Sequence, residues 1–331
     1  MMRWLCITLI ALQAMLAGAV HAQPALPDQF IRFQAQDQQL QDIGWRLAHG
    51  NADYCDFTRL SAGLQLQDMR SYRSPDTVRR ALGLAGDFAI ASVAHRSPAE
   101  AAGLRPNQEV VAVSGQQLSA WPAQARFDWS RQTRVLDLID RTLTQDGSIA
   151  IMLAGNETVK LRGQPICATR FELGDGGDHA VADGQRVVIG RDFPAFSYSQ
   201  DELAAAIAHE TAHVWLQHHK WLAIEGRKQR NIRATEREAD RLMPWLLANA
   251  GYDPAAALRF MRRWGPKHDG GFLRKGTHDG WDERADDIAA ELALVQQRMQ
   301  ASGRADWPQY FTRKTMIAGK LAKTGQSSAG E

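Results

Sequence analysis

The chain has few cysteines, almost no charge imbalance and few long apolar stretches. Its 331 residues include three cysteines, and the net charge is +2 with no dense run of lysine and arginine. Nucleic acid is therefore not an expected partner. No CxxC or Cys-His spacing occurs, which argues against zinc held by cysteines. Beyond residue 22 no stretch is long and uncharged enough to cross a bilayer, so no membrane span is expected in the mature chain.

The one long apolar stretch lies at the N-terminus. Arg3 precedes an apolar run from Trp4 to Val20, which ends in the small-x-small sequence Val20-His21-Ala22. This pattern predicts a cleavable secretory signal peptide over residues 1–22. A retained anchor is the alternative, but the run is rather short for a membrane span. We therefore expect a periplasmic or secreted protein.

Two cysteines remain after cleavage of the predicted signal peptide. Cys55 and Cys167 form an even pair in an oxidising compartment. The sequence therefore predicts a disulfide that closes a long loop and stabilises the fold by a few kcal/mol. Two separately buried thiols are the alternative.

Length and hydrophobic periodicity indicate two domains of an α+β protein. A chain of 331 residues can bury two separate cores. Apolar residues at helical spacing predict a helix within residues 28–50. After the leader we divide the chain into an N-terminal helical segment (23–58), a β-rich domain (59–165), a mainly helical domain (166–300) and a loose polar tail (301–331).

Short segments of alternating polarity predict the strands of the β-rich domain, with one longer helix near residues 131–144 among them. A hairpin over residues 179–190, turning at Asp183-Gly184, begins the helical domain. Its edge strand could hold a substrate backbone in extended form. The strands expected before it are 63–67, 88–93, 109–113, 148–153 and 158–161.

A short motif links two of these strands. In the sequence Ser97-Pro98-Ala99-Glu100-Ala101-Ala102-Gly103-Leu104, Ser97 and Pro98 can begin a short helix and Gly103 can end it. This pattern resembles the core of PDZ domains in bacterial envelope proteases. The resemblance implies that Leu82, Gly83 and Leu84 form the loop that receives a peptide carboxylate, with the peptide added as a strand. A PDZ-like fold used only as a spacer or lid is the alternative.

The most specific motif is His209-Glu210-Thr211-Ala212-His213. A helix places residues four apart on one face, so both imidazoles can bind one metal ion. Glu210 lies beside that face and can act on a metal-bound water. The sequence before the motif, Ser199 to Glu202, is typical of a capping box that begins a helix.

Two histidines do not complete a catalytic zinc site, which needs a third protein ligand and an open fourth position. Glu236 and Asp240 lie four residues apart on a segment with helical spacing, so they share one face. One can bind the metal while the other accepts a hydrogen bond from a ligand histidine.

Three further polar residues near these motifs are expected at the surface. Glu238 is rotated away from the face of Glu236, so it is expected to face solvent. His218 and His219 do not keep the four-residue spacing from His213, so surface positions are more plausible for them than ligand positions.

In this order the motifs resemble the gluzincin metallopeptidases of metallopeptidase family forty-eight, the HtpX and BepA type. The resemblance covers about residues 167–295 and implies a zincin-type domain with one Zn²⁺ per chain. It implies that Glu210 is the general base and that Asp240 orients a ligand histidine. The zinc ligands that it implies are His209, His213 and Glu236.

A further family motif, Thr-His-Pro followed by Arg, corresponds to Thr277-His278 and Arg284, with Asp279 in the place of the proline. Two roles are open for His278. Either His278 or Arg284 steadies the developing oxyanion, or His278 caps the open zinc position and keeps the enzyme latent.

Together these patterns favour an exported zinc endopeptidase that hydrolyses peptide bonds of unfolded or misassembled envelope proteins. A PDZ-like module would bind peptide C-termini or extended strands. The alternative is a chaperone-like or peptide-binding periplasmic protein with a latent zinc site.

Overall fold

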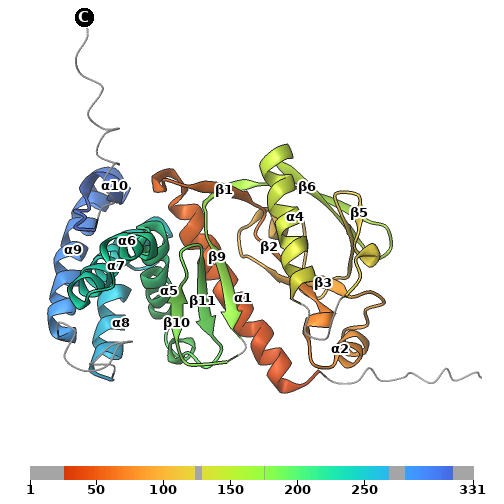
Figure 1. Ribbon diagram of the computed structural model, residues 1–331. Helices are drawn as coiled ribbons and strands as arrows, with labels where there is room; N and C mark the ends of the chain where they lie inside the picture. Colours follow the sequence, from red (N-terminus) through yellow and green to blue (C-terminus); the bar gives the residue numbers. More distant parts are fainter. Residues whose placement is uncertain (1–25, 124–128, 175, 268–279, 316–331) are drawn as a thin grey trace, which may run out of the picture.

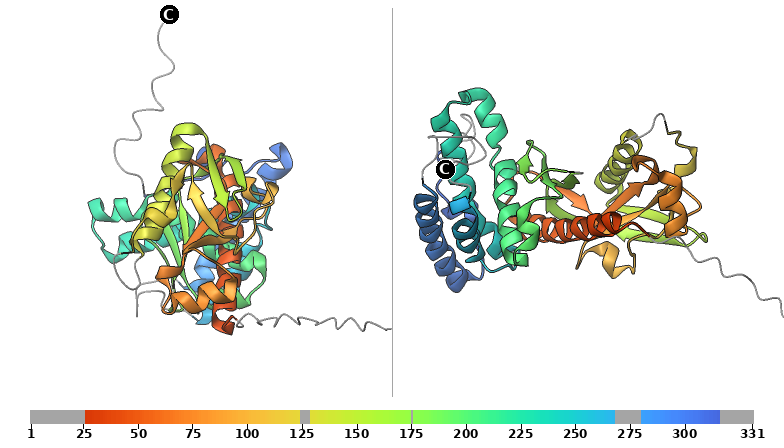
Figure 2. Two further views of the ribbon diagram at one scale, coloured as in Figure 1. Left: turned by 90° about the vertical axis from the view of Figure 1, so that its right-hand side faces the viewer. Right: turned by 90° about the horizontal axis from the view of Figure 1, so that it is seen from below.

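Two lobes lie side by side, and helix α1 (Asp28–Gly50) runs from one to the other (Figures 1 and 2). The computed structural model describes residues 26–123, 129–174, 176–267 and 280–315. One lobe holds most of the strands and the other is mainly helical, so the fold is α+β. Helix α1 confirms the helix predicted within residues 28–50.

The β-rich lobe contains two antiparallel sheets that share a core with helix α4 (Ser130–Asp146). Leu138, Ile139 and Leu143 of α4 pack against the buried side chains of Leu66 and Ile149. The predicted strands are confirmed to within one residue at each end. They are β2 (Leu64–Asp68), which pairs with β3 (Phe88–Val93), and β4 (Val110–Val113), β6 (Ser148–Leu153) and β7 (Thr158–Arg162), which follow one another in the second sheet. Strand β5 (Gln116–Gln117), which was not predicted, pairs with the other side of β4, and helices α2 (Pro75–Leu82) and α3 (Pro98–Ala101) lie between strands.

The helical lobe is built on a three-stranded sheet of order β10 (Ala180–Ala182), β11 (Arg186–Gly190), β9 (Arg170–Gly174). Strands β10 and β11 form the predicted hairpin with Asp183 and Gly184 at its turn, and β10 is the edge strand. Gly184 has φ +89°, a conformation that glycine adopts without strain. The helices are α5 (Gln200–Trp215), α6 (His218–Glu225), α7 (Gln229–Asn249), α8 (Ala256–Trp264), α9 (Trp281–Ser302) and α10 (Trp307–Tyr310).

The N-terminal segment joins the lobes. Strand β1 (Thr58–Ser61) pairs antiparallel with β8 (Gln164–Cys167), which leads into the helical lobe. Just before β1, Cys55 is bonded to Cys167, with their Cα atoms 5.6 Å apart, so the predicted disulfide is confirmed. Leu40, Ile43 and Leu47 of α1 belong to the core of the helical lobe. The N-terminal helix is therefore an integral part of that lobe.

The prediction of a loose tail from residue 301 is wrong for the part that the structure describes. Helix α9 continues to Ser302, and α10 follows with Asp306 capping its first turn. Trp307 and Phe311 are buried in the core of the helical lobe. These apolar side chains pin residues 303–315 to the lobe, whereas residues 316–331 lie outside the described residues.

The loop expected to receive a peptide carboxylate has a different role. Gly83 ends α2 with φ +69°, and its N–H group is hydrogen-bonded to Arg80, as in an ordinary helix C-terminus. Leu82 and Leu84 pack against the small core around Phe30 and Met69.

The strand that follows this loop has no free edge. Strand β3 pairs with β2 on one side, and on the other side the Ile90 N–H and C=O groups bond to Gln108 and Asn107. A peptide therefore cannot add beside β3, and the role inferred from the PDZ resemblance is not supported there.

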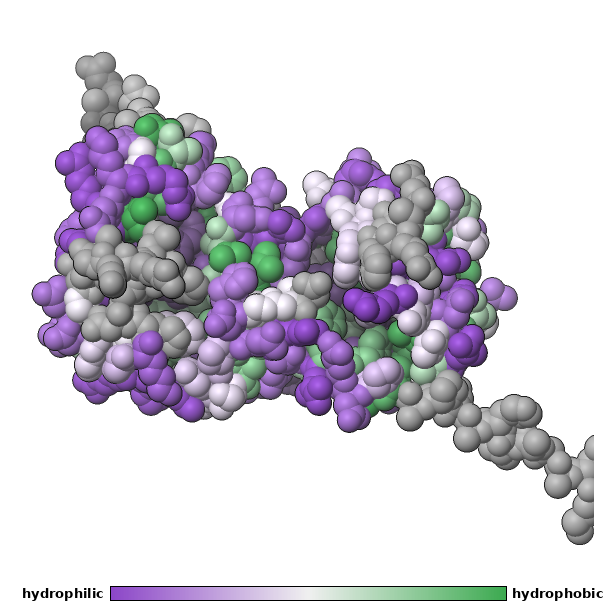
Figure 3. Space-filling model, turned by 60° about the horizontal axis from the view of Figure 1, so that its bottom comes forward, coloured by the Kyte–Doolittle hydropathy of each residue, from purple (hydrophilic) through white to green (hydrophobic). Residues whose placement is uncertain are grey.

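The surface between the lobes is indented, and hydrophilic side chains cover most of the face in Figure 3. A cleft of about 900 Å³ lies between the lobes; its walls include Arg59 and Asp140 from one lobe and Arg170 and Trp215 from the other. Among the described residues no helix is long and apolar enough to cross a membrane. The predicted signal peptide, residues 1–22, lies outside the described part.

Candidate metal centre

Helix α5 carries the HExxH motif through the middle of the helical lobe. The predicted capping box is confirmed: the Ser199 hydroxyl accepts from the Glu202 N–H at 3.3 Å, and the Glu202 carboxylate accepts from the Ser199 N–H at 3.2 Å. These bonds satisfy N–H groups that have no partner within the helix. From Glu202 to Ala212 every residue of α5 is buried, which fixes the helix and its side chains in the core.

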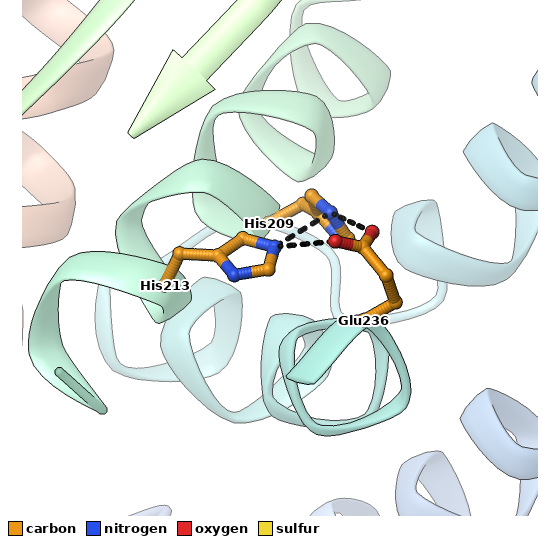
Figure 4. Close-up of side chains that lie close together, drawn as sticks. All are labelled: His209, His213 and Glu236. Carbon is orange, nitrogen blue, oxygen red and sulfur yellow. Dashed lines mark hydrogen bonds and ion pairs between the residues drawn. The ribbon is translucent and has the colours of Figure 1, made fainter. Parts of the chain in front are cut away.

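Three ligand atoms from α5 and α7 converge on one point (Figure 4). The Nε2 atoms of His209 and His213 are 3.2 Å apart. Glu236 Oε2 lies 3.4 Å from His209 Nε2, and Glu236 Oε1 lies 3.5 Å from His213 Nε2. A tetrahedral ion with ligands at about 2.0–2.1 Å requires them to be about 3.3–3.4 Å from each other. The cluster can therefore hold one metal ion.

Asp240 orients one of the two imidazoles. Its Oδ1 lies 3.0 Å from His209 Nδ1, and the carboxylate has no exposed surface. Asp240 also accepts hydrogen bonds from Arg284 Nε at 2.6 Å and Nη2 at 2.9 Å. Asp240 lies beside His209, as predicted, and Arg284, one of the two residues considered for the oxyanion, contacts the metal centre through Asp240.

Glu210 is buried beside the ligands. Burial raises the pKa of its carboxyl to about 7, which the charge of His209 opposes and the charge of Glu236 reinforces. A carboxyl group that titrates near neutral pH can both take up and release a proton under working conditions. This is the property that a general base in this position needs.

In the metal-free chain, burial and the neighbouring side chains together set the pKa values of the three ligands. Burial alone would lower the pKa of His209, but hydrogen bonds with Asp240 and Glu236 raise it to about 10. Burial lowers the pKa of His213 to about 3. Burial would raise the pKa of Glu236, yet the neighbouring imidazoles of His213 and His209 lower it below its usual range. A proton on His209 thus provides the positive charge that a metal ion would otherwise bring.

Two residues expected at the surface belong to this centre, so both predictions are wrong. His218 and Glu238 are each buried, and their side chains lie 3.3 Å apart. His218 Nδ1 is 2.9 Å from His213 Nδ1. Gln217 has φ +57°, which ends α5 and starts α6 in a new direction, so helical spacing from His213 no longer applies. His219 is exposed, as predicted.

Glu238 is covered by a segment that is distant in sequence. Burial would raise its pKa, but hydrogen bonds from His218 and from Thr315, together with the Lys314 N–H, lower it to about 2. The only local indication of where the Glu238 side chain lies was its place two residues after Glu236, which on a helix puts it on a different face from Glu236. Nothing near Glu238 in the sequence indicates that residues 311–315 cover that face.

One other residue, His278, completes the comparison with the predicted site. His278 lies outside the described residues, so its role stays a prediction. His209, His213 and Glu236 are not among the residues that line the cleft between the lobes.

Comparison with known proteins gives no match to any family model and none to any curated sequence. The assignment of this centre therefore depends on its geometry.

Proposed function

We propose that the protein is a zinc-dependent endopeptidase. The observation that supports this most directly is the convergence of His209, His213 and Glu236 at the separations of a tetrahedral site, with Glu210 alongside. Two nitrogen ligands and one oxygen ligand suit zinc, and three protein ligands leave the open position typical of catalytic sites. When bound there, zinc would polarise the scissile carbonyl and lower the pKa of a water molecule.

The protein's own residues supply the proton transfers and the positioning. Glu210 takes a proton from the attacking water and gives it to the leaving amine, because its buried carboxyl group lies beside the metal ligands. Asp240 holds the His209 ring through Nδ1 and leaves Nε2 for the metal. His213 and Glu236 are partly exposed, which gives a substrate access to this side of the cluster.

The edge of the small sheet offers a place for an extended substrate. Within the described part of the chain, strand β10 pairs with one neighbour, β11, and it packs against α5. A polypeptide that pairs with an edge strand must itself be extended, which favours unfolded chains over folded ones. With the predicted export, this makes unfolded or misassembled envelope proteins the proposed substrates. The β-rich lobe enters the proposal as a spacer or lid, because β3 has no free edge.

The test is digestion of casein by the zinc-loaded protein and by Glu210→Gln. We expect the variant to lose about 10²- to 10⁴-fold in kcat while it still binds zinc, because only the proton acceptor is removed. Glu225→Gln, on the exposed end of α6, is the matched control. Equal digestion by wild type and Glu210→Gln would contradict the endopeptidase and leave the chaperone-like alternative.

The role of His278 can be decided in the same assay. His278→Ala should lower turnover if this side chain steadies the oxyanion. It should raise turnover if the side chain caps the zinc.

A further inference from the structure

We propose that His218 and Glu238 are positioning residues that fix the tautomer of His213, and that residues 311–315 hold them in place. The proposal rests on the metal site of the proposed function and adds a second support to it. We refer to residues 311–315 as the C-terminal strap. The observations are a chain of buried hydrogen bonds from the strap to His213.

The first step is the ionisation state of the Glu238 carboxyl group. Its Oε1 atom accepts from the N–H groups of Lys314 and Thr315, the latter at 2.7 Å, and its Oε2 atom accepts from the Thr315 hydroxyl. All three partners donate, which is the environment of an ionised carboxylate that can only accept. His218 Nε2, 3.3 Å from Oε2, must therefore carry a hydrogen and donate it.

The second step is the direction of the bond between the two imidazoles. A neutral imidazole with a hydrogen on Nε2 has an acceptor at Nδ1. His218 Nδ1 therefore accepts from His213 Nδ1–H across the 2.9 Å that separate them. This leaves His213 Nε2 without a hydrogen, and that atom points into the cluster with His209 and Glu236.

The third step is what holds Glu238. The strap is fixed at one end by Phe311, which is buried, and along its length by Arg313. Arg313 Nη2 donates to Leu216 C=O at 2.7 Å and to Thr315 C=O at 2.8 Å, which ties the strap to the end of α5. The strap thus binds Glu238 of α7 and the last turn of the helix that carries the ligand histidines.

The result is that both ligand imidazoles are oriented by carboxylates of one helix. Asp240 contacts His209 directly and is held by Arg284. Glu238 contacts His213 through His218 and is held by the strap. Helix α7 therefore supplies one ligand and two orienting carboxylates, and metal affinity should depend on a segment about a hundred residues further along the chain than His213.

The main test is Glu238→Gln in the full chain. The strap N–H groups require an oxygen at the Oε1 position, so the new amide NH₂ must face His218 Nε2 and donate to it. This reverses both bonds and places the hydrogen of His213 on Nε2, where it blocks the metal. We expect zinc binding to weaken about 10- to 100-fold, measured by competition with a chromophoric chelator.

We refer to the hydrogen-bonded path from Glu238 through His218 to His213 as the relay. Two more variants distinguish loss of this relay from a general loss of packing. His218→Phe removes the acceptor and should weaken zinc binding to a similar extent, whereas His219→Phe, at the exposed neighbour, should not. Thr315→Val keeps the strap N–H bonds, removes one donor to Glu238 and should give a smaller loss in the same direction. Urea unfolding of the metal-free variants establishes that they are folded.

Nitrogen-15 spectra of the imidazoles report the tautomer itself. In the wild type we expect a hydrogen on His213 Nδ1, and in Glu238→Gln a hydrogen on Nε2 of the metal-free protein. A His213 Nδ1 without hydrogen, or Glu238→Gln and His218→Phe that bind zinc as tightly as wild type, would overturn the proposal.

The two proposals fail differently. If the variants bind zinc normally while casein is still digested in a Glu210-dependent way, the relay is wrong and the endopeptidase stands. If zinc binding follows the relay but digestion does not depend on Glu210, the endopeptidase is wrong and the relay stands. A wild type without measurable zinc affinity overturns both.

Discussion

Arg284 on α9 donates two hydrogen bonds to Asp240 on α7, from Nε at 2.6 Å and from Nη2 at 2.9 Å. Asp240 lies 3.0 Å from His209 Nδ1, so the guanidinium acts on the metal ligand through one buried carboxylate. This bidentate geometry is specific to arginine. Arg284 therefore has two possible roles, support of the metal site through Asp240 and direct contact with the oxyanion.

We predict that Arg284→Lys weakens zinc binding by about tenfold or more, because an ammonium group cannot replace both bonds to Asp240. The zinc dissociation constant and kcat at saturating zinc measure the two roles separately. Arg237→Lys, on the more exposed part of α7, is the control. If zinc binding is unchanged and kcat of the zinc-saturated enzyme falls about 10²- to 10³-fold, Arg284 is an oxyanion group instead.

Zinc binding should strengthen as pH rises. Burial alone would lower the pKa of His209, but hydrogen bonds with Asp240 and Glu236 raise it to about 10, so the metal-free protein holds a proton there at neutral pH. A metal ligand must lose its proton, so protons compete with zinc below that pKa. Affinity should therefore rise about tenfold per pH unit up to about pH 10, the pKa of His209 in the metal-free protein.

Calorimetry in two buffers of different ionisation enthalpy counts the protons released when zinc binds. We expect about one proton or more per zinc at pH 8. An affinity that does not change with pH would show that His209 is already neutral in the metal-free protein.

The disulfide should contribute strongly to stability. Cys55 and Cys167 are separated by 112 residues, so the bond restricts a large part of the unfolded chain. We predict that the Cys55→Ser, Cys167→Ser double variant loses about 2–4 kcal/mol of unfolding free energy, measured in urea. Reduction of the wild type should give a similar loss, and the double variant should not respond to reductant.

Asp37, half-buried on α1, should make the protein less stable at neutral than at acidic pH. Burial raises its pKa to about 6, although a hydrogen bond from Gln41 opposes the shift. Between about pH 4 and pH 6 the folded state therefore binds more protons than the unfolded state, and this contribution to stability falls as pH rises through that window.

We predict that Asp37→Asn changes the unfolding free energy little at about pH 4 and raises it by about 1–3 kcal/mol at about pH 8. Urea unfolding at the two pH values measures the difference. Asp192→Asn, at a well-exposed carboxylate, should show no such pH dependence. A gain of equal size at both pH values would mean that the charge of Asp37 is not the cause.

The parts of the site that the sequence predicted are set by short-range geometry. The capping box joins Ser199 to Glu202, and helical spacing aligns His209 with His213 and Glu236 with Asp240. Each relation spans three or four residues within one helix, so a periodic pattern determines it. The convergence of α5 and α7 was inferred from the order of the motifs, and the structure places the three ligand atoms within 4.8 Å of one another.

The errors arose where local pattern and tertiary contact disagree. Leu82, Gly83 and Leu84 match a loop motif, yet Gly83 ends helix α2 in a left-handed conformation, and the side chains of Leu82 and Leu84 pack against the small core around Phe30 and Met69. The polar composition after residue 301 suggested a loose tail, but a few buried apolar residues such as Trp307 are enough to fix it.

By itself the sequence predicted helix α1, strands β2, β3, β4, β6 and β7, the β10–β11 hairpin, the disulfide pair and the faces on which the metal ligands lie, because each follows from local periodicity, a turn motif or the pairing of the two remaining cysteines. Only the tertiary structure decided the surroundings of His218 and Glu238. The left-handed turn at Gln217 breaks the helical spacing, and the partner that buries Glu238 comes from residues 314–315. Hydrogen bonds between segments so far apart depend on how the helices pack, and no short stretch of sequence encodes that.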